Sequence, residues 1–418
     1  MKPQTLKGFR DFLPKEARKR QYVINIIKSV FESYGFEPLE TPALEYEEIL
    51  LGKYGDEGDK LMYRFEDNGG RKVALRYDQT VPLARVIAQY LPRNGGGQNE
   101  LPMPFKRYQI QNVWRAENTQ RGRFREFLQM DADIVGSDSP LSDAEVIAIA
   151  IKSLEILGFK DFKILINDRS VFKDIPKEAI STLDKLKKIG EENVIKEMIS
   201  KGISEEESRN ILEKTKAQEK TELIKNCSQI LKNIGIDEEL LKFEPTLARG
   251  LSYYTGLIFE AEIEGYGAGS VAGGGRYDNL IGMFADLPAG RQVPAVGFSF
   301  GFDRLMEAME QFDLFPKDLS KTKALVTIFS KELREKSLEV YKKLRDENIN
   351  CEIYLPAGRQ GLDENTPLEK QLKYADKKEI PYTIIIGPEE IKNNTITLRN
   401  MKTRKQETIS VEALFSKL

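Results

Sequence analysis

Apolar side chains recur every three or four residues near the start of the chain, from residue 14 to residue 34. This spacing predicts an amphipathic helix, because positions three and four apart lie on one face of a helix. Pro14 suits the first turn of that helix, and Gly35 suits the position just after its last turn. The expected apolar stripe consists of Val23, Ile26, Ile27, Val30 and Phe31.

Residues 36–136 change to an alternation of apolar and polar side chains, which is typical of strands. Asn68-Gly69-Gly70 predicts the turn of a hairpin over residues 61–77. Residues 104–117 and 123–136 are expected to form two further strands, joined by an Arg-rich segment. Since few parallel crossovers fit between these strands, we expect an antiparallel sheet.

Residues 170–240 are rich in Lys and Glu, poor in Gly and aromatics, and helical in period, which indicates a helical insertion. Strand-like sequence returns at residues 251–265, and residues 296–309 predict a strand followed by a helix. We therefore expect one α+β domain with an antiparallel sheet over residues 1–320.

The last part of the chain follows a different pattern. Residues 311–322 are the best candidate for a linker, and after them strands alternate with helices. This alternation predicts a separate α/β domain over residues 323–418. Its expected elements are strands at 323–329, 351–355, 382–386 and 395–401, helices at 331–346 and 366–378, and a short last helix.

Composition narrows the class of protein. The chain has 418 residues, 40% hydrophobic and 31% charged, with a net charge of −2, so its overall field indicates no polyanionic partner. No apolar run reaches membrane-spanning length, and the N-terminus has no apolar leader. The two cysteines, Cys227 and Cys351, have neither disulfide-framework nor metal-site spacing. We expect a cytoplasmic protein without a membrane segment.

Two oddities of the sequence bear on function. The hexapeptide LPAGRQ occurs at residues 287–292 and 355–360, and its Pro and Gly predict exposed loops without function. The chain contains no histidine. Because histidine is the usual general base and metal ligand, any chemistry must rest on Arg, Lys, Asp, Glu, Tyr, backbone groups or a hydrated cation.

Arginines concentrate in the segment WRAENTQRGRFREFLQMD, residues 114–131. A guanidinium group binds phosphate or carboxylate with two hydrogen bonds, so Arg115 and Arg123 are candidates for an anion site. On a strand, Glu117 would face the same side as Arg115. A solvated hairpin held by salt bridges explains this segment equally well.

The segment RGLSYYTG, residues 249–256, favours the anion site. Arg249 precedes two adjacent tyrosines, Tyr253 and Tyr254. On a strand, one tyrosine would enter the core while the other offered its hydroxyl to a ligand. Two sheet aromatics beside a surface arginine remain the alternative.

Two more segments carry candidate side chains. In GFSFGFDR, residues 297–304, the glycine spacing lets a flat ligand approach the sheet, and Arg304 can cap it. In LRYDQT, residues 75–80, Asp78 and Thr80 can hold an ammonium group. The alternatives are a surface helix and a solvated turn. The sequence contains neither a Walker A motif nor a GxGxxG that opens a βαβ unit, so a phosphate site would be built from arginines.

Together these segments resemble the signature motifs of the class II aminoacyl-tRNA synthetases. FEPLETPALEY, with Pro42, is similar to motif 1, WRAE…RGRFREFLQMDAD, with Arg115, to motif 2, and GFSFGFDRL, with Arg304, to motif 3. LRYDQTVPLAR, RGLSYYTGLIFE and GGGRYDNLIGMF resemble further motifs of the histidyl-tRNA synthetase family. The resemblance covers nearly the whole chain, and its last part is similar to that family's anticodon-binding domain.

The resemblance implies a histidine–tRNA ligase that uses ATP with Mg²⁺, L-histidine and tRNA-His, as a cytoplasmic homodimer. It implies that Arg115 and Arg249 bind the α-phosphate of ATP and that Arg304 binds the γ-phosphate and stacks on adenine. It also implies that Arg123 and Glu117 help to place ATP. The residues implied for histidine are Asp78, Thr80 and Gln129 around the α-amino group, Asp133 and Tyr254 at the imidazole, and Tyr253 and Arg249 beside them.

Such a reaction suits a chain without histidine. The carboxylate of the amino acid attacks the α-phosphorus of ATP, so no general base is needed and catalysis is positioning plus charge stabilisation. Buried groups that pair with both imidazole nitrogens would reject other side chains by roughly 10⁴–10⁵-fold, because an unpaired buried polar group is costly.

The chain departs from the family pattern at Ser252, where Asp is usual, at Gln79, where an apolar residue is usual, in both LPAGRQ segments, and in its lack of histidine. The last departure suggests an enzyme that can be translated when charged tRNA-His is scarce. Two alternative functions are an inactive paralogue that regulates by binding histidine or tRNA, and a general RNA-binding protein. Regulatory paralogues of the biosynthetic type lack the anticodon-binding domain, and RNA binders carry a basic stripe that is missing here.

Overall fold

The structure is a computed structural model of the chain. It describes residues 2–90, 101–120, 122–249, 253–284, 292–320, 322–356 and 366–418. Arg121, Ser252 and most of both LPAGRQ segments lie outside the described residues. The chain divides into two compact units, Met1–Phe315 and Pro316–Leu418.

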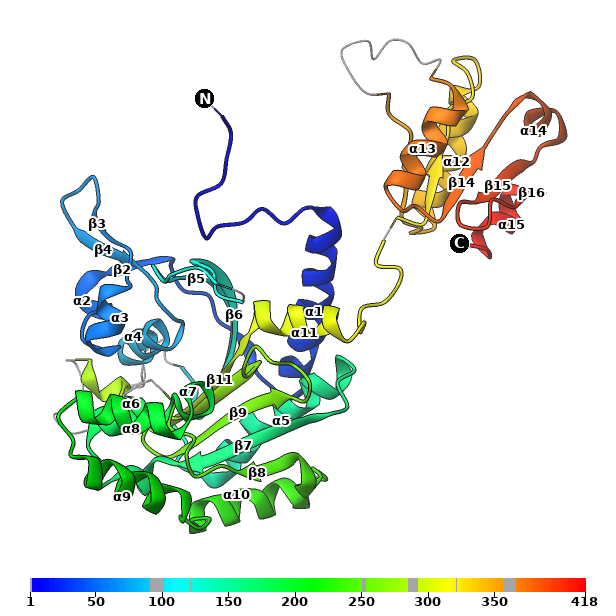
Figure 1. Ribbon diagram of the computed structural model, residues 1–418. Coiled ribbons are helices and arrows are strands. Elements are labelled where there is room, and N and C mark those ends of the chain that lie inside the picture. Colours follow the sequence, from blue (N-terminus) through cyan, green and yellow to red (C-terminus); the bar gives the residue numbers. More distant parts are fainter. Residues whose placement is uncertain are drawn as a thin grey trace. The chain divides into compact units, whose positions relative to one another are not determined.

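An eight-stranded sheet forms the centre of the first unit (Figure 1). In spatial order its strands are β1 (Glu37–Pro38), β5 (Phe105–Trp114), β6 (Glu126–Val135), β11 (Ala295–Gly301), β10 (Ala272–Arg276), β9 (Leu257–Ile263), β7 (Phe162–Asp168) and β8 (Leu241–Phe243). From β5 to β7 all neighbours pair antiparallel. The short edge strands β1 and β8 pair parallel. The antiparallel prediction is therefore confirmed for the middle of the sheet, while both edges differ from it.

Strands β5 and β6 pair along all ten residues of each. On β6, Met130 and Ala132 belong to the large apolar core. Alternate residues of a strand face opposite sides, so Asp131 and Asp133 face the other side of the sheet. β5 ends at Trp114, and Arg115 lies just beyond the strand rather than on it, contrary to the sequence-based expectation.

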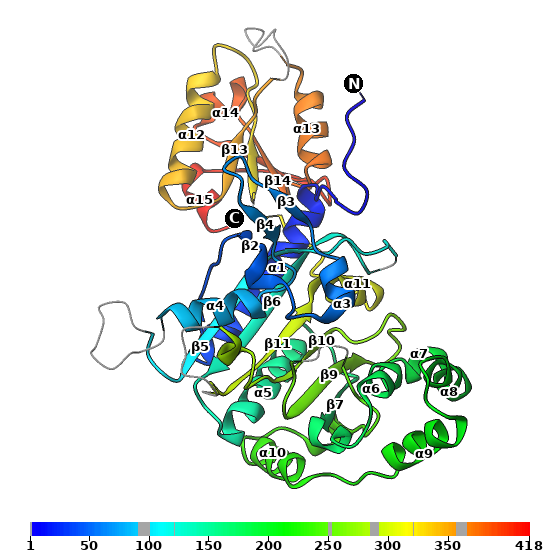
Figure 2. The same cartoon turned by 90° about the vertical axis from the view of Figure 1, so that its left-hand side faces the viewer.

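Helices pack on the apolar side of this sheet, and Figure 2 shows α1 and α5 against it. They are α1 (Pro14–Ser33), α5 (Pro140–Ile156), α10 (Glu222–Asn233) and α11 (Phe302–Gln311). The predicted first helix is confirmed, with Val23, Ile27 and Phe31 buried. Gly35 follows it with a φ of 77°, a left-handed conformation that glycine adopts without strain.

A second core lies on the opposite, polar side of the sheet, where Phe105 and Val135 contribute to it. The predicted hairpin is confirmed and belongs to a three-stranded sheet above this core. Helix α4 was not predicted. The elements here are β2 (Leu44–Tyr46), β4 (Lys72–Leu75), β3 (Arg64–Glu66), α2 (Glu47–Leu50), α3 (Gly55–Lys60) and α4 (Thr80–Tyr90).

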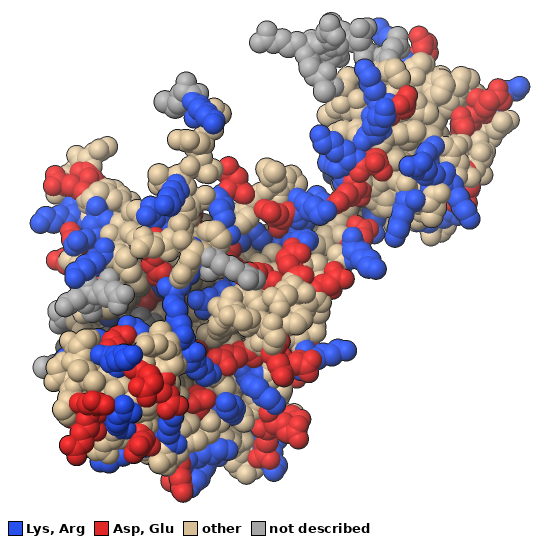
Figure 3. Space-filling model, in the orientation of Figure 1, with Lys and Arg blue, Asp and Glu red and all other residues tan. Residues whose placement is uncertain are grey.

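The helical character predicted for residues 170–240 is confirmed. Its helices are α6 (Lys177–Leu183), α7 (Leu186–Ile189), α8 (Glu191–Ser200), α9 (Glu205–Lys216) and α10. The first four surround an apolar cluster of their own, whereas α10 belongs to the large core. Over α6 to α9 acidic and basic side chains intermingle on the face shown in Figure 3. Ion pairs such as Lys185 with Glu197, at 2.6 Å, account for this pattern.

The second unit is a five-stranded sheet with helices. Its strands, in spatial order, are β13 (Cys351–Ile353), β12 (Ala324–Val326), β14 (Tyr382–Ile385), β15 (Ile396–Asn400) and β16 (Gln406–Ile409). Its helices are α12 (Arg334–Asp346), α13 (Leu368–Lys377), α14 (Pro388–Asn393) and α15 (Val411–Phe415). The predicted α/β alternation is confirmed, although β16 and α14 were not foreseen.

Candidate active site

A pocket of about 300 Å³ lies on the polar side of the eight-stranded sheet. Strands β6, β10 and β11, the first residues of α4 and α11, and the segments after β4 and β5 contribute to its lining. Every side chain that the sequence put forward for ligand binding is in this lining. They are Asp78, Thr80, Arg115, Glu117, Arg123, Gln129, Asp133, Arg249, Tyr253, Tyr254 and Arg304.

Strand β6 presents three polar side chains to the pocket. Gln129, Asp131 and Asp133 line it, while Met130 and Ala132 between them are buried in the apolar core. Sequence reasoning selected Gln129 and Asp133 but missed Asp131. The two-residue spacing of polar side chains in an otherwise apolar strand was the signal that would have found it.

Asp133 is held from two sides. The guanidinium of Arg107, on β5, lies 2.7 Å from Oδ2 of Asp133, and the Tyr277 hydroxyl donates a hydrogen bond to Oδ1. Gly297, on β11, leaves the necessary space, because a Cβ there would lie 1.9 Å from the same Oδ1. Asp133 therefore has a fixed position in the pocket wall. Neither Arg107 nor Tyr277 was selected from the sequence.

One buried guanidinium faces two carboxylates in this part of the pocket. Arg107 is fully buried and lies 4.0 Å from Asp131 as well. Burial raises the pKa of Asp131 to about 7; the charge of Arg107 opposes this rise and the negative charge of Asp133 adds to it. Burial also raises the pKa of Asp133 and of Asp78. Excess negative charge of this kind favours a ligand that is cationic or donates hydrogen bonds.

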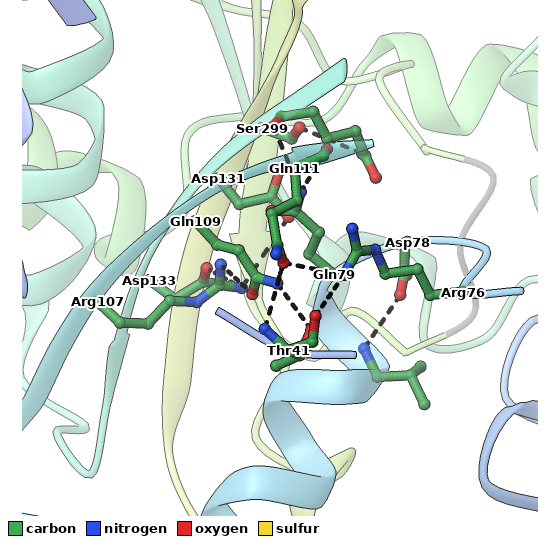
Figure 4. Close-up of polar contacts among 12 residues, drawn as sticks. Thr41, Arg76, Asp78, Gln79, Arg107, Gln109, Gln111, Asp131, Asp133 and Ser299 are labelled. Atoms are coloured by element: carbon green, nitrogen blue, oxygen red, sulfur yellow. Dashed lines mark hydrogen bonds and ion pairs between the residues drawn. The ribbon is translucent and has the colours of Figure 1, made fainter. Parts of the chain in front are cut away.

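A buried polar layer continues from Arg107 to the segment before β2 (Figure 4). Arg107 donates to Gln109 at 3.3 Å, and Gln109 donates to the Thr41 hydroxyl at 2.8 Å. Arg76 donates to the Thr41 carbonyl at 2.7 Å and to the Gln111 side chain at 2.9 Å. Because buried polar groups with partners escape the cost of desolvation, this layer fixes Arg107 behind the pocket.

Gln79 stands where the resemblance led us to expect an apolar residue. Its side chain is fully buried and donates to the backbone carbonyls of Gln111, at 2.8 Å, and Gln129, at 3.3 Å. The amide thus joins the segment before α4 to β5 and β6 beneath it. These hydrogen bonds explain how a polar side chain is accommodated at this position.

Asp78 is partly satisfied by the protein itself. Its Oδ1 accepts hydrogen bonds from the Tyr54 hydroxyl, at 2.8 Å, and from the backbone N–H of Val81, at 3.1 Å. Its Oδ2 has no hydrogen-bond partner among the described residues, and the same holds for Oε1 of Gln129 and Oδ1 of Asp131. Buried acceptors without donors are costly, so three of them around one pocket fit the N–H groups of an ammonium ligand.

Both tyrosines of the pair line the pocket. Tyr253 and Tyr254 lie before β9 rather than on a strand, with their ring centroids 4.9 Å apart. Tyr253 also packs edge-on against Tyr277, at 5.9 Å. Tyr254 also belongs to a buried apolar cluster with Leu165, Leu247 and Ile258, so one ring does enter the core as expected. The expected division between the two rings does not hold, because both line the pocket and neither lies on a strand.

The tyrosines are supported from the segment that follows them. The backbone N–H of Thr255 donates to the Arg276 carbonyl at 2.7 Å, and its hydroxyl donates to Asp278 at 3.0 Å. The Arg276 guanidinium binds both oxygens of buried Asp143, at 3.0 and 2.8 Å. This buried pair anchors the end of β10 and, through it, the tyrosine segment.

Arg249 is held close to the sheet. Its Nη1 donates to the Phe259 carbonyl and to Glu260, both at 3.1 Å. A Cβ at Gly273 would lie 1.7 Å from this nitrogen, so only glycine leaves space for the guanidinium. The backbone of Arg249 has a φ of 52°, a left-handed conformation that costs a non-glycine residue free energy.

Arg115 sits against aromatic rings. Its Nε donates to the Tyr77 carbonyl at 3.0 Å, and its guanidinium carbon lies 4.3 Å from the Tyr77 ring centroid and 5.2 Å from that of Phe127. These contacts orient the planar guanidinium in the pocket lining. Phe127 was not selected from the sequence.

Arg304 and Arg123 form the more open part of the lining. Arg304, in the first turn of α11, donates to the Ser270 carbonyl at 3.1 Å. Burial and the positive charge of Arg123 lower its pKa. Arg123 lies 3.4 Å from Glu117, and its side chain is 45% exposed. Two guanidiniums that repel each other in this way are suited to a multiply charged anion.

The described part of the chain holds no group of three or more Cys, Asp or Glu side chains arranged to bind a metal ion. None of its helices combines the length and the apolar character that crossing a membrane requires.

The site and the fold together define a class of enzyme. Arginines from the β5–β6 connection, from the segment before β9 and from the helix after β11 meet on one face of an antiparallel sheet. The same chain carries a separate α/β unit. This is the architecture of a class II aminoacyl-tRNA synthetase.

Comparison with known proteins narrows the class to a family. A family model described as histidyl-tRNA synthetase matches residues 8–193 and 195–305, and one described as anticodon binding domain matches residues 323–418. The chain is 38% identical to the histidine–tRNA ligase of Christiangramia forsetii, over 99% of this chain and 98% of that one, and 39% identical to that of Gloeobacter violaceus, over 97% and 96%. The crystal structure of histidyl-tRNA synthetase from Nostoc sp. PCC 7120 matches with a TM-score of 0.81 at 30% identity and covers 100% of both chains. The chain therefore belongs to the histidyl-tRNA synthetase family.

Proposed function

We propose that the chain is a histidine–tRNA ligase, which makes histidyl-adenylate and pyrophosphate from L-histidine and ATP and then transfers histidine to the 3′ end of tRNA-His. Membership of the family, with relatives matched over nearly their whole length, supports this function. The observation that carries it is that one pocket combines arginines suited to phosphates with acids and tyrosines suited to an amino acid.

The histidine end of the pocket would be the buried one. Asp78, Thr80 and Gln129 would surround the α-ammonium group, where the unpartnered oxygens of Asp78 and Gln129 are acceptors in need of donors. Asp133 would accept a hydrogen bond from one imidazole nitrogen, and the Tyr254 hydroxyl would pair with the other. Arg107 and Tyr277 support this role, because they fix Asp133 in one orientation.

The arginines would bind ATP. Arg115 and Arg249 would take the α-phosphate from two sides, while Arg304 would take the γ-phosphate and one face of the adenine. Arg123 and Glu117 would help to position the nucleotide. Mg²⁺ is expected to arrive as part of the ATP substrate, where it neutralises phosphate charge, and Glu117 is a lining carboxylate that fits such an ion.

Adenylate formation follows from these positions. A carboxylate oxygen of histidine attacks the α-phosphorus, and the bond from that phosphorus to the β-phosphate bridging oxygen breaks, so pyrophosphate leaves. No proton is transferred. The guanidiniums of Arg115 and Arg249 would stabilise the charge that gathers on the oxygens of the five-coordinate phosphorus. In the second step a hydroxyl oxygen of the terminal ribose of tRNA attacks the histidyl carbonyl carbon and gives up its proton, and the bond from that carbon to the phosphate oxygen breaks, so AMP leaves.

The second unit would bind the anticodon of tRNA-His, since residues 323–418 within it match the family model described as anticodon binding domain. A cytoplasmic location would bring the enzyme to its tRNA. The free cysteines Cys227 and Cys351 are both buried and are compatible with a reducing compartment.

We also expect a homodimer, in which a second copy covers an apolar face near motif 1. Leu44, Tyr46 and Phe65 are exposed on the sheet formed by β2, β4 and β3. Tyr46 and Phe65 both lie opposite Val73, so they share one face of that sheet. Adjacent exposed apolar side chains are typical of protein interfaces.

The alternative function is a regulator that binds histidine or tRNA without catalysis. The pocket provides the buried acids and tyrosines that such a binder needs, but it also contains Arg115, Arg249 and Arg304. A histidine sensor would have no use for three guanidiniums placed for a triphosphate. The presence of the anticodon-binding unit also favours the ligase.

Pyrophosphate exchange measured with each amino acid in turn separates the two functions. A ligase should incorporate labelled pyrophosphate into ATP with histidine and should give background exchange with the other amino acids. Histidine binding, measured by calorimetry on the same protein, serves as the control for a folded site. Binding without exchange would favour the regulator and contradict the proposed function.

A further inference from the structure

The segment before α1 lies against the Arg-rich connection between β5 and β6. The Gly8 carbonyl accepts the backbone N–H of Arg125 at 3.0 Å. Gly8 has a φ of 88°, and a Cβ there would lie 2.7 Å from Cγ of Arg125, so the two chains touch closely. The ring of Phe9 packs edge-on against Tyr63, at 6.4 Å. These contacts fix the segment at the border of the pocket.

Arg10 bridges two parts of the pocket lining that are distant in sequence. Its guanidinium carbon lies 3.2 Å from the ring centroid of Phe124, and its Nη2 lies 2.8 Å from Oδ2 of Asp303. Phe124 belongs to the β5–β6 connection, Asp303 belongs to the first turn of α11, and both line the pocket. Phe124 follows Arg123 directly, and Asp303 directly precedes Arg304.

A second arginine reinforces the contact with Asp303. Arg20, on α1, lies 3.3 Å from Oδ1 of Asp303, and its guanidinium stacks 3.8 Å from the ring of Phe12. The Asp303 side chain is only 10% exposed. Arg10 and Arg20 thus hold Asp303 from both of its oxygens, and the start of α11 is tied to the segment before α1.

We propose that Arg10 is a positioning residue for ATP. Through Phe124 and Asp303 it holds Arg123 and Arg304 at a fixed separation, although their like charges repel each other. The triphosphate and adenine then meet two guanidiniums that are already in place. Arginine suits this role better than lysine, because its planar group stacks on a ring with one face while its edge pairs with a carboxylate. The inference rests on the proposed function, since it names ATP as the ligand.

The test compares Arg10→Ala with Arg10→Lys, and uses Lys7→Ala as the matched control. Lys7 is an exposed cation on the same segment. In histidine-dependent pyrophosphate exchange, Arg10→Ala should raise the KM for ATP about tenfold and leave the KM for histidine unchanged. Arg10→Lys should recover part of this loss, and Lys7→Ala should match the wild type.

Two results would overturn the inference: an unchanged KM for ATP in Arg10→Ala, or equal increases in KM for both substrates together with a lower Tm. The second result would mean that Arg10 only supports the fold. Equilibrium dialysis with Mg-ATP alone gives an independent readout, in which Arg10→Ala should bind about tenfold more weakly. This measurement does not depend on the amino acid, so a failure of the wild type to exchange with histidine would reject the proposed function without deciding the role of Arg10.

Discussion

The buried acidic side chains of the pocket and its more exposed arginines are held in different ways. Asp133, with a side chain 4% exposed, is clamped by Arg107 and Tyr277 in a buried polar layer. Arg123, with a side chain 45% exposed, pairs loosely with Glu117 at 3.4 Å. The difference suits the two tasks proposed for them. Choice among amino acids needs polar groups that are locked at their own side chains, whereas a phosphate-binding guanidinium must stay accessible to its ligand. Arg123 is therefore held through the neighbouring Phe124 and keeps an exposed side chain.

Arg249 is an arginine that is held as firmly as the buried acids, and its substitution offers the largest expected effect on catalysis. Its guanidinium lies close to Gly273 and donates a hydrogen bond to Glu260, so its position is fixed in the way that the position of a buried acid is. Arg249→Ala should lower kcat for pyrophosphate exchange by about 10²–10³-fold, because the change removes the preorganised donor that we propose for the α-phosphate. Exchange rates at saturating substrates measure this effect.

Arg209→Ala serves as the control for that change. Arg209 is an exposed arginine on α9 that pairs with Glu205. It should leave kcat unchanged, and thermal melts should show both variants folded. If Arg249→Ala kept kcat within about threefold of the wild type, the arginine would not stabilise the transition state.

Tyr254→Phe tests the buried group with a smaller change. The ring keeps its packing against Tyr253, but the hydroxyl proposed to bind imidazole is gone. The KM for histidine should rise about tenfold, as expected for one unpaired buried group, while the KM for ATP stays the same. Substrate titrations of pyrophosphate exchange measure both values. An unchanged histidine affinity would show that Tyr254 does not bind the imidazole.

The smallest expected effect concerns stability and pH. Burial raises the pKa of Asp131 to about 7. The folded protein therefore keeps a proton that the unfolded chain releases above about pH 4, and stability is lost as pH rises from there to about 7. Asp131→Asn has no such proton to lose, so the free energy of unfolding of this variant relative to the wild type should rise by about 1 kcal/mol between about pH 6 and about pH 8.

Urea denaturation at the two pH values measures this difference. Asp138→Asn is the matched control, because Asp138 is an exposed aspartate close to the end of the same strand. Its stability relative to the wild type should not depend on pH. A constant difference for Asp131→Asn would show that the buried carboxylates do not carry the expected excess charge.

The sequence predicted best those elements whose periodicity was undisturbed. Helix α1 has one apolar face, and the ten-residue strands β5 and β6 alternate clearly, so all three were recognised. Helix α4 was missed because almost every side chain from Val81 to Ala88 is buried, which leaves no polar face to give a period of 3.6. Pro82 in its first turn added to the difficulty, since proline also marks loops.

The sequence predicted those side chains of the site that stand in recognisable local motifs. Arg107 could not, because its role depends on strand pairing: it lies directly opposite Asp133 in the register of β5 and β6. Tyr277 lies in the segment GGGRYDNLIGMF, which was cited only for its resemblance to a family motif, and only the fold brings its hydroxyl to Asp133. The prediction that Tyr253 and Tyr254 lie on a strand was wrong for a different reason. The strand pattern was extended to residues before Leu257, where β9 begins.

Strand β5 ends at Trp114, the single tryptophan of the chain. Its indole lies 5.5 Å from the Arg76 guanidinium and is followed directly by Arg115. Tryptophan emission from this protein therefore originates at one place, where the buried polar layer meets the arginine that is expected to touch the α-phosphate. A binding step that rearranges this junction would change the intrinsic fluorescence of the unlabelled enzyme and could be followed without an added dye.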